Sequence, residues 1–175
     1  ILPNIPTTAV QIASSFTYLS LGHLSSTKPE KKKILARKKG YHGVTVASAS
    51  MTGLPNQHKL FDLPKEHFIH TETPHYFKER NQGESEGDYL ARLTKSLEEL
   101  IEKEGAETIA AMIAEPLMGA GGVILPPEGY FPAIQAVLNK YDIPLIADEV
   151  ITGFGRTGNA FGSETYDIKP TSMTL

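Results

Sequence analysis

Two acidic residues stand directly after strongly apolar segments of this chain. Asp148 follows the run 144–147, and Glu115 follows the run 109–114. A buried carboxylate is unfavourable unless a cation, a metal ion or strong hydrogen-bond donors satisfy it. For Asp148, one suitable partner is the protonated ring nitrogen of a bound cofactor. The alternative is an aspartate that caps the turn at 152–153, and the Asp-Glu dipeptide by itself favours that alternative.

Glu149 is adjacent to Asp148 at the end of the same predicted strand. Neighbouring side chains of a strand point to opposite faces of a sheet, so we expect the two carboxylates to be separated by the strand. This arrangement argues against a pair of carboxylates that act on one substrate, as a glycosidase requires.

Tyr41 and His42 lie in a glycine-flanked turn at 40–43, which in isolation is typical of a structural turn. The glycine-rich stretch 119–122 suggests a phosphate loop. It lacks the Gly-x-Gly-x-x-Gly pattern at the start of a helix, which argues against a dinucleotide site. Three further histidines occur in predicted strands and loops: His67, His70 and His75. They do not have the spacing of a zinc motif, and we predict no metal site.

Apolar runs separated by turn residues predict strands that alternate with helices. The predicted strands are 34–36, 67–70, 109–114 and 144–147, and the predicted helices lie at 44–50, 85–105 and 134–141. This alternation indicates an α/β fold with a mostly parallel sheet and helices on both faces. In such sheets ligands bind beyond the carboxyl ends of the strands, a rule that singles out Tyr41, Glu115 and Asp148.

The helix at 85–105 has the clearest local signals. Ser85 and Asp88 have the spacing of a capping box, although Asp is a weaker partner there than Glu. The apolar stripe of this helix consists of Leu90, Leu93, Leu97, Leu100 and Ile101. Gly105 is expected to end the helix.

Composition and charge argue against several classes of function. The chain has 175 residues and a net charge of −3, whereas a nucleic-acid-binding surface usually shows a basic excess. The basic residues within 31–39 are interpreted as a solvated strand edge. No cysteine is present, and no apolar run approaches the roughly 20 residues that span a bilayer. We expect a soluble intracellular protein without nucleic-acid or membrane partners, in either the cytoplasm or the mitochondrion.

Three segments together resemble the class III aminotransferases, and they occur in the order found in that family. The longest is Ile146-Ala147-Asp148-Glu149-Val150-Ile151-Thr152-Gly153-Phe154-Gly155-Arg156-Thr157-Gly158. The others are Ala114-Glu115-Pro116 leading to Gly119-Ala120-Gly121-Gly122-Val123, and Gly40-Tyr41-His42-Gly43. The resemblance is closest to the omega-aminotransferases, including gamma-aminobutyrate and beta-alanine transaminases that use pyruvate or a related keto acid.

The resemblance implies a cofactor, pyridoxal 5′-phosphate, and a role for each residue. Asp148, the expected catalytic residue, would bind the pyridine nitrogen of the cofactor, and Val150 would pack on the ring. Tyr41 would stack over the ring with His42 beside it. Glu115 would lie near the substrate and a mobile arginine. The reaction would move an amino group from an amine or omega-amino acid to a keto acid, in a homodimer with its active site at the interface.

The resemblance covers residues 31–175 and implies an incomplete large domain of the aspartate-aminotransferase type (fold type I). Residues 1–30 are expected to be irregular and not to match the family. The family's Gly-Ser-x-Ala loop, which binds the cofactor phosphate, has no counterpart there, because the candidate Ala13-Ser14-Ser15 lacks the glycine. The family's cofactor-holding lysine would follow Leu175, and Thr171 replaces a usual Asp.

These departures favour a second hypothesis, in which the chain is a non-catalytic or truncated product that retains the fold. A third hypothesis, an unrelated α/β binding domain, would require three ordered motifs to coincide by chance.

Overall fold

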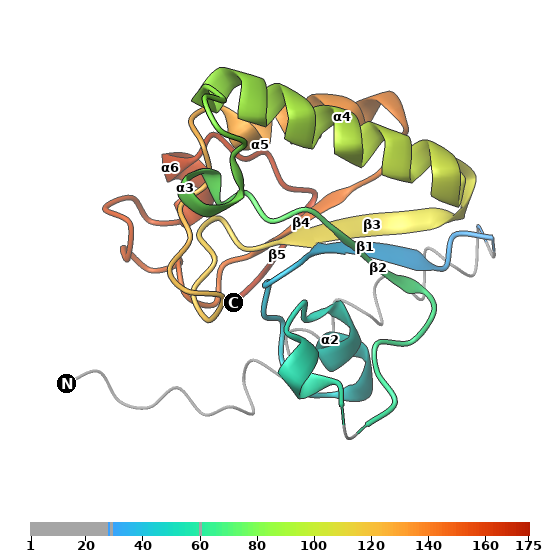
Figure 1. Ribbon diagram of the computed structural model, residues 1–175. Helices are drawn as coiled ribbons and strands as arrows, with labels where there is room; N and C mark the ends of the chain where they lie inside the picture. Colours follow the sequence, from blue (N-terminus) through green and yellow to red (C-terminus); the bar gives the residue numbers. More distant parts are fainter. Residues whose placement is uncertain (1–27, 29, 60) are drawn as a thin grey trace.

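Five parallel strands form the sheet at the centre of the protein (Figure 1). The computed structural model describes residues 28, 30–59 and 61–175, so the predicted segment 1–30 lies almost wholly outside the described residues. The strands are β1 (Lys33–Arg37), β2 (Phe68–Thr71), β3 (Ile109–Ala114), β4 (Leu145–Asp148) and β5 (Ser172–Thr174), in the order β2-β1-β3-β4-β5. Each neighbouring pair is parallel, which confirms the predicted sheet.

Helices cover both faces of this sheet, as predicted. Helices α4 (Glu86–Glu104) and α5 (Tyr130–Lys140) lie on one face, and the short helix α2 (Val46–Met51) lies on the other (Figure 1). The remaining helical turns are η1 (Pro55–Gln57), α3 (Tyr76–Glu79), η2 (Ala106–Thr108) and α6 (Gly162–Thr165).

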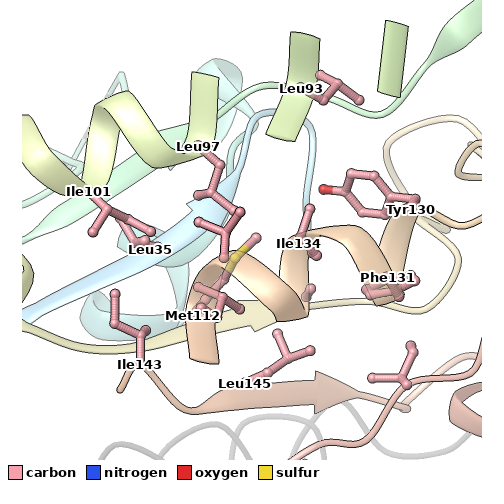
Figure 2. Close-up of a cluster of buried hydrophobic side chains, with 14 of the residues drawn as sticks. Leu35, Leu93, Leu97, Ile101, Met112, Tyr130, Phe131, Ile134, Ile143 and Leu145 are labelled. Atoms are coloured by element: carbon pink, nitrogen blue, oxygen red, sulfur yellow. The ribbon is translucent and has the colours of Figure 1, made fainter. Parts of the chain in front are cut away.

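The larger core lies between α4, α5 and the sheet. Leu97 and Ile101 of α4 point toward Leu35 and Met112 of the sheet, and Leu93 is buried in the same core (Figure 2). Burial of side chains of this size contributes about 1.5–3 kcal/mol each, which is what holds α4 on the sheet.

The predicted stripe of α4 differs from the observed one at its edges. Tyr89 is fully buried, whereas Leu90 and Leu100 are half-buried beside the core. The helix begins after Ser85, whose hydroxyl oxygen accepts a hydrogen bond from the Asp88 N–H at 3.1 Å. The Asp88 carboxylate accepts from the Ser85 hydroxyl at 2.6 Å. Gly105 follows the last residue of the helix, as predicted.

The interpretation of the basic residues within 31–39 as a solvated strand edge is wrong for the position of the strand and for Arg37, although Lys32 and Lys38 are exposed. β1 lies between β2 and β3 inside the sheet, and its last residue, Arg37, is 1% exposed. Its guanidinium lies 5.9 Å from the ring centroid of Tyr130 and 5.6 Å from that of Phe131. The aromatic rings of α5 therefore cover a cation that its sequence context had suggested would face solvent.

Two element boundaries also differ from prediction. Helix α2 begins at Val46 rather than at residue 44, because Thr45 forms a capping box with Ser48. Strand β5 was not predicted. It is short, and its side chains at Ser172 and Met173 are exposed, so it lacks the apolar run that marks a buried strand.

Candidate active site

The carboxyl ends of β3 and β4 place two acidic residues side by side. Ala114 of β3 pairs with Ala147 of β4, and each strand continues into an acid, Glu115 or Asp148. Both carboxylates are buried. The strand-end rule therefore brings together the residues that the sequence singled out.

His42 contacts Asp148 directly. The Nδ1 atom of His42 lies 2.8 Å from Oδ2 of Asp148, and both side chains are almost wholly buried. A carboxylate accepts hydrogen bonds but does not donate them, so Nδ1 carries the hydrogen in this pair. The backbone N–H of His42 donates to the Thr52 hydroxyl at 2.9 Å, which fixes the start of the turn against the end of α2.

Asp148 has a second contact within its own chain segment. Its Oδ1 accepts a long hydrogen bond, 3.3 Å, from the backbone N–H of Val150. The alternative role for Asp148 was to cap the turn at 152–153. Glu149 takes that role instead, because its carboxylate accepts a hydrogen bond from the Thr152 hydroxyl. Asp148 and Glu149 serve opposite faces of β4, as the strand geometry predicts.

Glu115 joins two loops that meet at the strand ends. Its Oε1 accepts from the backbone N–H of Tyr41 at 2.9 Å, and its Oε2 accepts from the backbone N–H of Gly119 at 2.9 Å. Its backbone carbonyl accepts from Nη2 of Arg37. Hydrogen bonds to a charged acceptor contribute about 1.5–3 kcal/mol each, so Glu115 fixes the loop that carries Tyr41 to the loop after β3.

Glycines allow these loops to approach one another closely. A Cβ atom on Gly53 would lie 2.3 Å from the Arg37 carbonyl oxygen, and one on Gly121 would lie 2.4 Å from the Lys39 carbonyl oxygen. Contacts this short to backbone atoms exclude any side chain. The glycine pattern thus shapes the loops around Tyr41 by close packing.

His67, His70 and His75, which lack the spacing of a zinc motif, lie in a strand or in loops outside the site. His70 donates from Nε2 to the Met51 carbonyl at 3.0 Å, and burial lowers its pKa below the usual value. His67 lies 3.6 Å from exposed Glu66, and His75 precedes α3. Among the described residues, no three His, Cys, Asp or Glu side chains are placed to hold a metal ion.

Two residues of this site escaped sequence reasoning: Arg37 and Thr52. For Arg37 a signal existed, since it directly follows the apolar run 34–36 and so ends a buried strand. Thr52 acts through a partner in another segment, the backbone N–H of His42, and its residue type carries no comparable signal. Gly119 belongs to a motif that the sequence analysis named, but the hydrogen bond from its backbone N–H to Glu115 was not predicted.

The buried carboxylate of Asp148 suits a cationic ring nitrogen. Within the part of the chain that the structure describes, each of its oxygens has one hydrogen-bond partner, whereas a carboxylate can accept about four bonds in all. Among the ion pairs of the described residues, Asp148 pairs with His42 and with no Lys or Arg. The donor set therefore leaves room for one further positive donor, as the pyridine nitrogen of pyridoxal phosphate would supply.

The parallel sheet, its helical layers and the acidic strand ends define the large domain of a fold-type I transferase, incomplete in this chain. A sequence model of the Aminotransferase class-III family matches residues 7–175. The chain therefore belongs to the class III aminotransferases. The match begins at residue 7, within the segment 1–30 that we expected to lie outside the family.

Curated relatives are plant transaminases. The chain is 60% identical over 148 residues to gamma aminobutyrate transaminase 1, mitochondrial, of Solanum lycopersicum, covering 85% of this chain and 29% of that protein. It is 57% identical over 148 residues to gamma-aminobutyrate transaminase 1, mitochondrial, of Oryza sativa subsp. indica, with the same coverage of 85% and 29%. The chain thus spans less than a third of the length of these relatives.

Solved transaminases have the same fold. A transaminase solved with L-alanine aligns with a TM-score of 0.88 and 52% identity, covering 98% of this chain and 40% of that one. The omega transaminase of Pseudomonas jessenii in complex with PMP aligns with a TM-score of 0.87 and 51% identity, covering 92% of this chain and 37% of that one. No helix among the described residues is long and apolar enough to cross a membrane.

Proposed function

We propose that this chain carries the cofactor-facing part of a pyridoxal-phosphate-dependent transaminase. The observation that supports this proposal is the Asp148 carboxylate, which is 6% exposed, held by His42 and Val150, and unpaired with any Lys or Arg of the described residues. A cationic pyridine ring, when bound, withdraws electrons from the reacting carbon of the substrate.

The residues of this chain bind and orient in that scheme. Asp148 would hold a proton on the ring nitrogen by accepting its hydrogen bond, and His42 keeps the carboxylate in place by donating from Nδ1. Tyr41 would stack on the ring, and Val150 would pack on it as well. Glu115 shapes the substrate end, since its carboxylate ties Tyr41 to the loop after β3.

The names of the relatives suggest the substrates. We assign gamma-aminobutyrate or another omega-amino acid or amine as amino donor and a keto acid such as pyruvate as acceptor, because the curated relatives are gamma-aminobutyrate transaminases. The resemblance to the family implies a homodimer for the whole protein, and the names of both relatives suggest the mitochondrion as its location. Kinetics of the whole protein with gamma-aminobutyrate and pyruvate test this assignment, and absence of transfer between the two would refute it.

The cofactor site is tested by titrating pyridoxal 5′-phosphate into the protein and following absorbance between about 330 and 430 nm, where the aldehyde and amine forms of the cofactor absorb. Asp148→Asn should weaken binding by roughly 10- to 150-fold, because one charge-assisted hydrogen bond of about 1.5–3 kcal/mol is lost. Asp142→Asn is the matched control, since Asp142 is exposed and precedes the opposite end of β4. Equal affinities of the wild type and Asp148→Asn would remove the ring contact from the proposal.

A non-catalytic product that retains the fold is the second candidate. The observation in its favour concerns Lys169, the lysine closest in sequence to the family's cofactor-holding position. Lys169 is exposed, and its backbone exchanges hydrogen bonds with the Gln135 side chain at 3.0 and 2.9 Å. The same absorbance titration separates the candidates, because a protein without a cofactor site leaves the spectrum of added pyridoxal phosphate unchanged.

A further inference from the structure

Glu149 is fully buried, and its carboxylate accepts four hydrogen bonds. Its Oε1 accepts from the backbone N–H of Ser163 at 2.7 Å and from the hydroxyl of the same residue at 2.5 Å. Its Oε2 accepts from the backbone N–H of Gly162 at 2.9 Å and from the Thr152 hydroxyl. These four donors are uncharged, and no Lys, Arg or His of the described residues forms an ion pair with Glu149.

These contacts close a loop at its base. Thr152 lies in the turn after β4, and Gly162 begins α6, so one carboxylate holds both ends of the segment 153–161. The backbone carbonyl of Glu149 accepts from the Gly153 N–H at 2.7 Å, which tightens the same turn. A Cβ on Gly162 would lie 2.7 Å from Cβ of Thr152, so this closure also depends on a glycine.

The turn held by Glu149 reaches Asp148 through Val150. The Val150 N–H donates to Oδ1 of Asp148 at 3.3 Å, and Val150 lies between Glu149 and Thr152. The position of that N–H is set by the path of the backbone through the turn. The two adjacent carboxylates therefore have separate tasks: Asp148 faces the cofactor site, and Glu149 anchors the turn on the opposite face of β4.

We propose that Glu149 is a positioning residue of the transaminase site. Its carboxylate holds the turn from Val150 to Thr152 so that Asp148 stays aimed at the ring nitrogen of the cofactor. This inference rests on the proposed function, because the direction of Asp148 acts on the cofactor ring.

Glu149→Gln tests this inference with almost no change of volume. Either orientation of the amide places its NH2 group opposite a backbone N–H, that of Gly162 or that of Ser163, so one buried donor loses its acceptor. The matched control is Glu164→Gln, which alters an exposed carboxylate that accepts from the Ala160 N–H at 3.1 Å.

Thr152 provides a second, milder test. Thr152→Val removes the hydroxyl that donates to Glu149 while keeping the branched shape, and Thr152→Ser keeps the hydroxyl. The serine variant should therefore behave like the wild type in each measurement below, and the valine variant should behave like Glu149→Gln to a smaller degree.

Amide hydrogen exchange measures the local opening of the turn directly and needs no cofactor. In Glu149→Gln, exchange at Val150, Gly153 and Gly155 should be roughly 10- to 100-fold faster, because local opening costs less free energy. The amides of α4 and β1 should keep their rates, and Glu164→Gln should change neither set. Equal acceleration in α4, or no difference between Glu149→Gln and Glu164→Gln, would overturn the proposal.

The affinities for two matched ligands measure how Glu149→Gln affects Asp148. The pair is pyridoxal 5′-phosphate and its analogue with carbon in place of the ring nitrogen. Glu149→Gln should weaken binding of the first about tenfold and leave that of the analogue unchanged. An equal loss for both ligands would mean that Glu149 supports the fold alone, which would refute the positioning role. If the wild type binds neither ligand, the proposed function fails, whereas the exchange measurement still decides whether Glu149 fixes the turn.

Discussion

Replacing Arg37 by methionine removes a buried cation, and we expect the free energy of unfolding to change by less than about 2 kcal/mol. Within the described residues, Arg37 donates a hydrogen bond from Nη2 to the Glu115 carbonyl and interacts electrostatically with the Tyr130 hydroxyl, whereas its Nε and Nη1 atoms have no hydrogen-bond partner. Its side chain is 1% exposed and packs on the rings of Tyr130 and Phe131. Methionine can fill most of this space without bringing a charge or an unsatisfied donor.

The opposing contributions are of similar size. The substitution loses a hydrogen bond from a charged donor, about 1.5–3 kcal/mol, and two cation–π contacts of about 1 kcal/mol each. It also removes two unpartnered nitrogen donors, each of which costs about 1–3 kcal/mol when buried. Arg37→Ala has the same polar balance but leaves a cavity, so it should be about 2–4 kcal/mol less stable than Arg37→Met.

Urea unfolding followed by circular dichroism measures both variants against the wild type. For a chain of this length each kcal/mol corresponds to roughly 2–4 °C in Tm, so Arg37→Met should melt within about 8 °C of the wild type. A loss above about 4 kcal/mol for Arg37→Met, with an unchanged slope in urea, would refute the reasoning. It would mean that the guanidinium stabilises the strand ends far more than one hydrogen bond and two aromatic contacts allow.

Three further predictions concern pH, catalysis and the cofactor phosphate. Hydrogen bonds from Arg92 lower the pKa of Glu84 to about 2, so the stability that this pair contributes is present above about pH 4.5 and is lost as the pH falls toward 2. Glu84→Gln should flatten that part of an acid-unfolding curve, and an unchanged curve would contradict the pairing. Residues 1–175 taken alone should transfer no amino group to pyruvate, because the reaction needs a lysine nucleophile and Lys169, the nearest lysine in sequence to the position expected for it, is exposed and held at Gln135; alanine formation would disprove this. A family-like Gly-Ser-x-Ala segment grafted into 1–30 of a chain extended through that lysine should tighten pyridoxal phosphate binding by about a hundredfold, because phosphate takes several N–H bonds at a helix N-terminus. Equal affinities with and without the graft would show that residues 1–30 already bind the phosphate.

The periodic parts of the fold could be read from the sequence because they depend on local patterns. The apolar run 109–114 became the fully buried strand β3, and the capped stripe at 85–105 became α4. Parallel strands end at the same edge of a sheet, so the order of elements alone placed Glu115 and Asp148 together. The roles of these residues toward a cofactor remain predictions that the titration of Asp148→Asn tests.

Other features were decided by tertiary structure. Charge suggested that Arg37 faces solvent, but the central place of β1 and the rings of α5 bury it. The contact between His42 and Asp148 joins residues 106 positions apart, and no local pattern specifies which donor reaches which oxygen. Glu149 was expected to point away from the site, and only the return of the chain at α6 supplies the backbone N–H groups that its carboxylate binds. The buried face of a helix or strand can be predicted from the sequence, because apolar residues recur along it with the period of that element. The partners of a buried polar group come from distant segments, and so they are determined by how the whole chain packs.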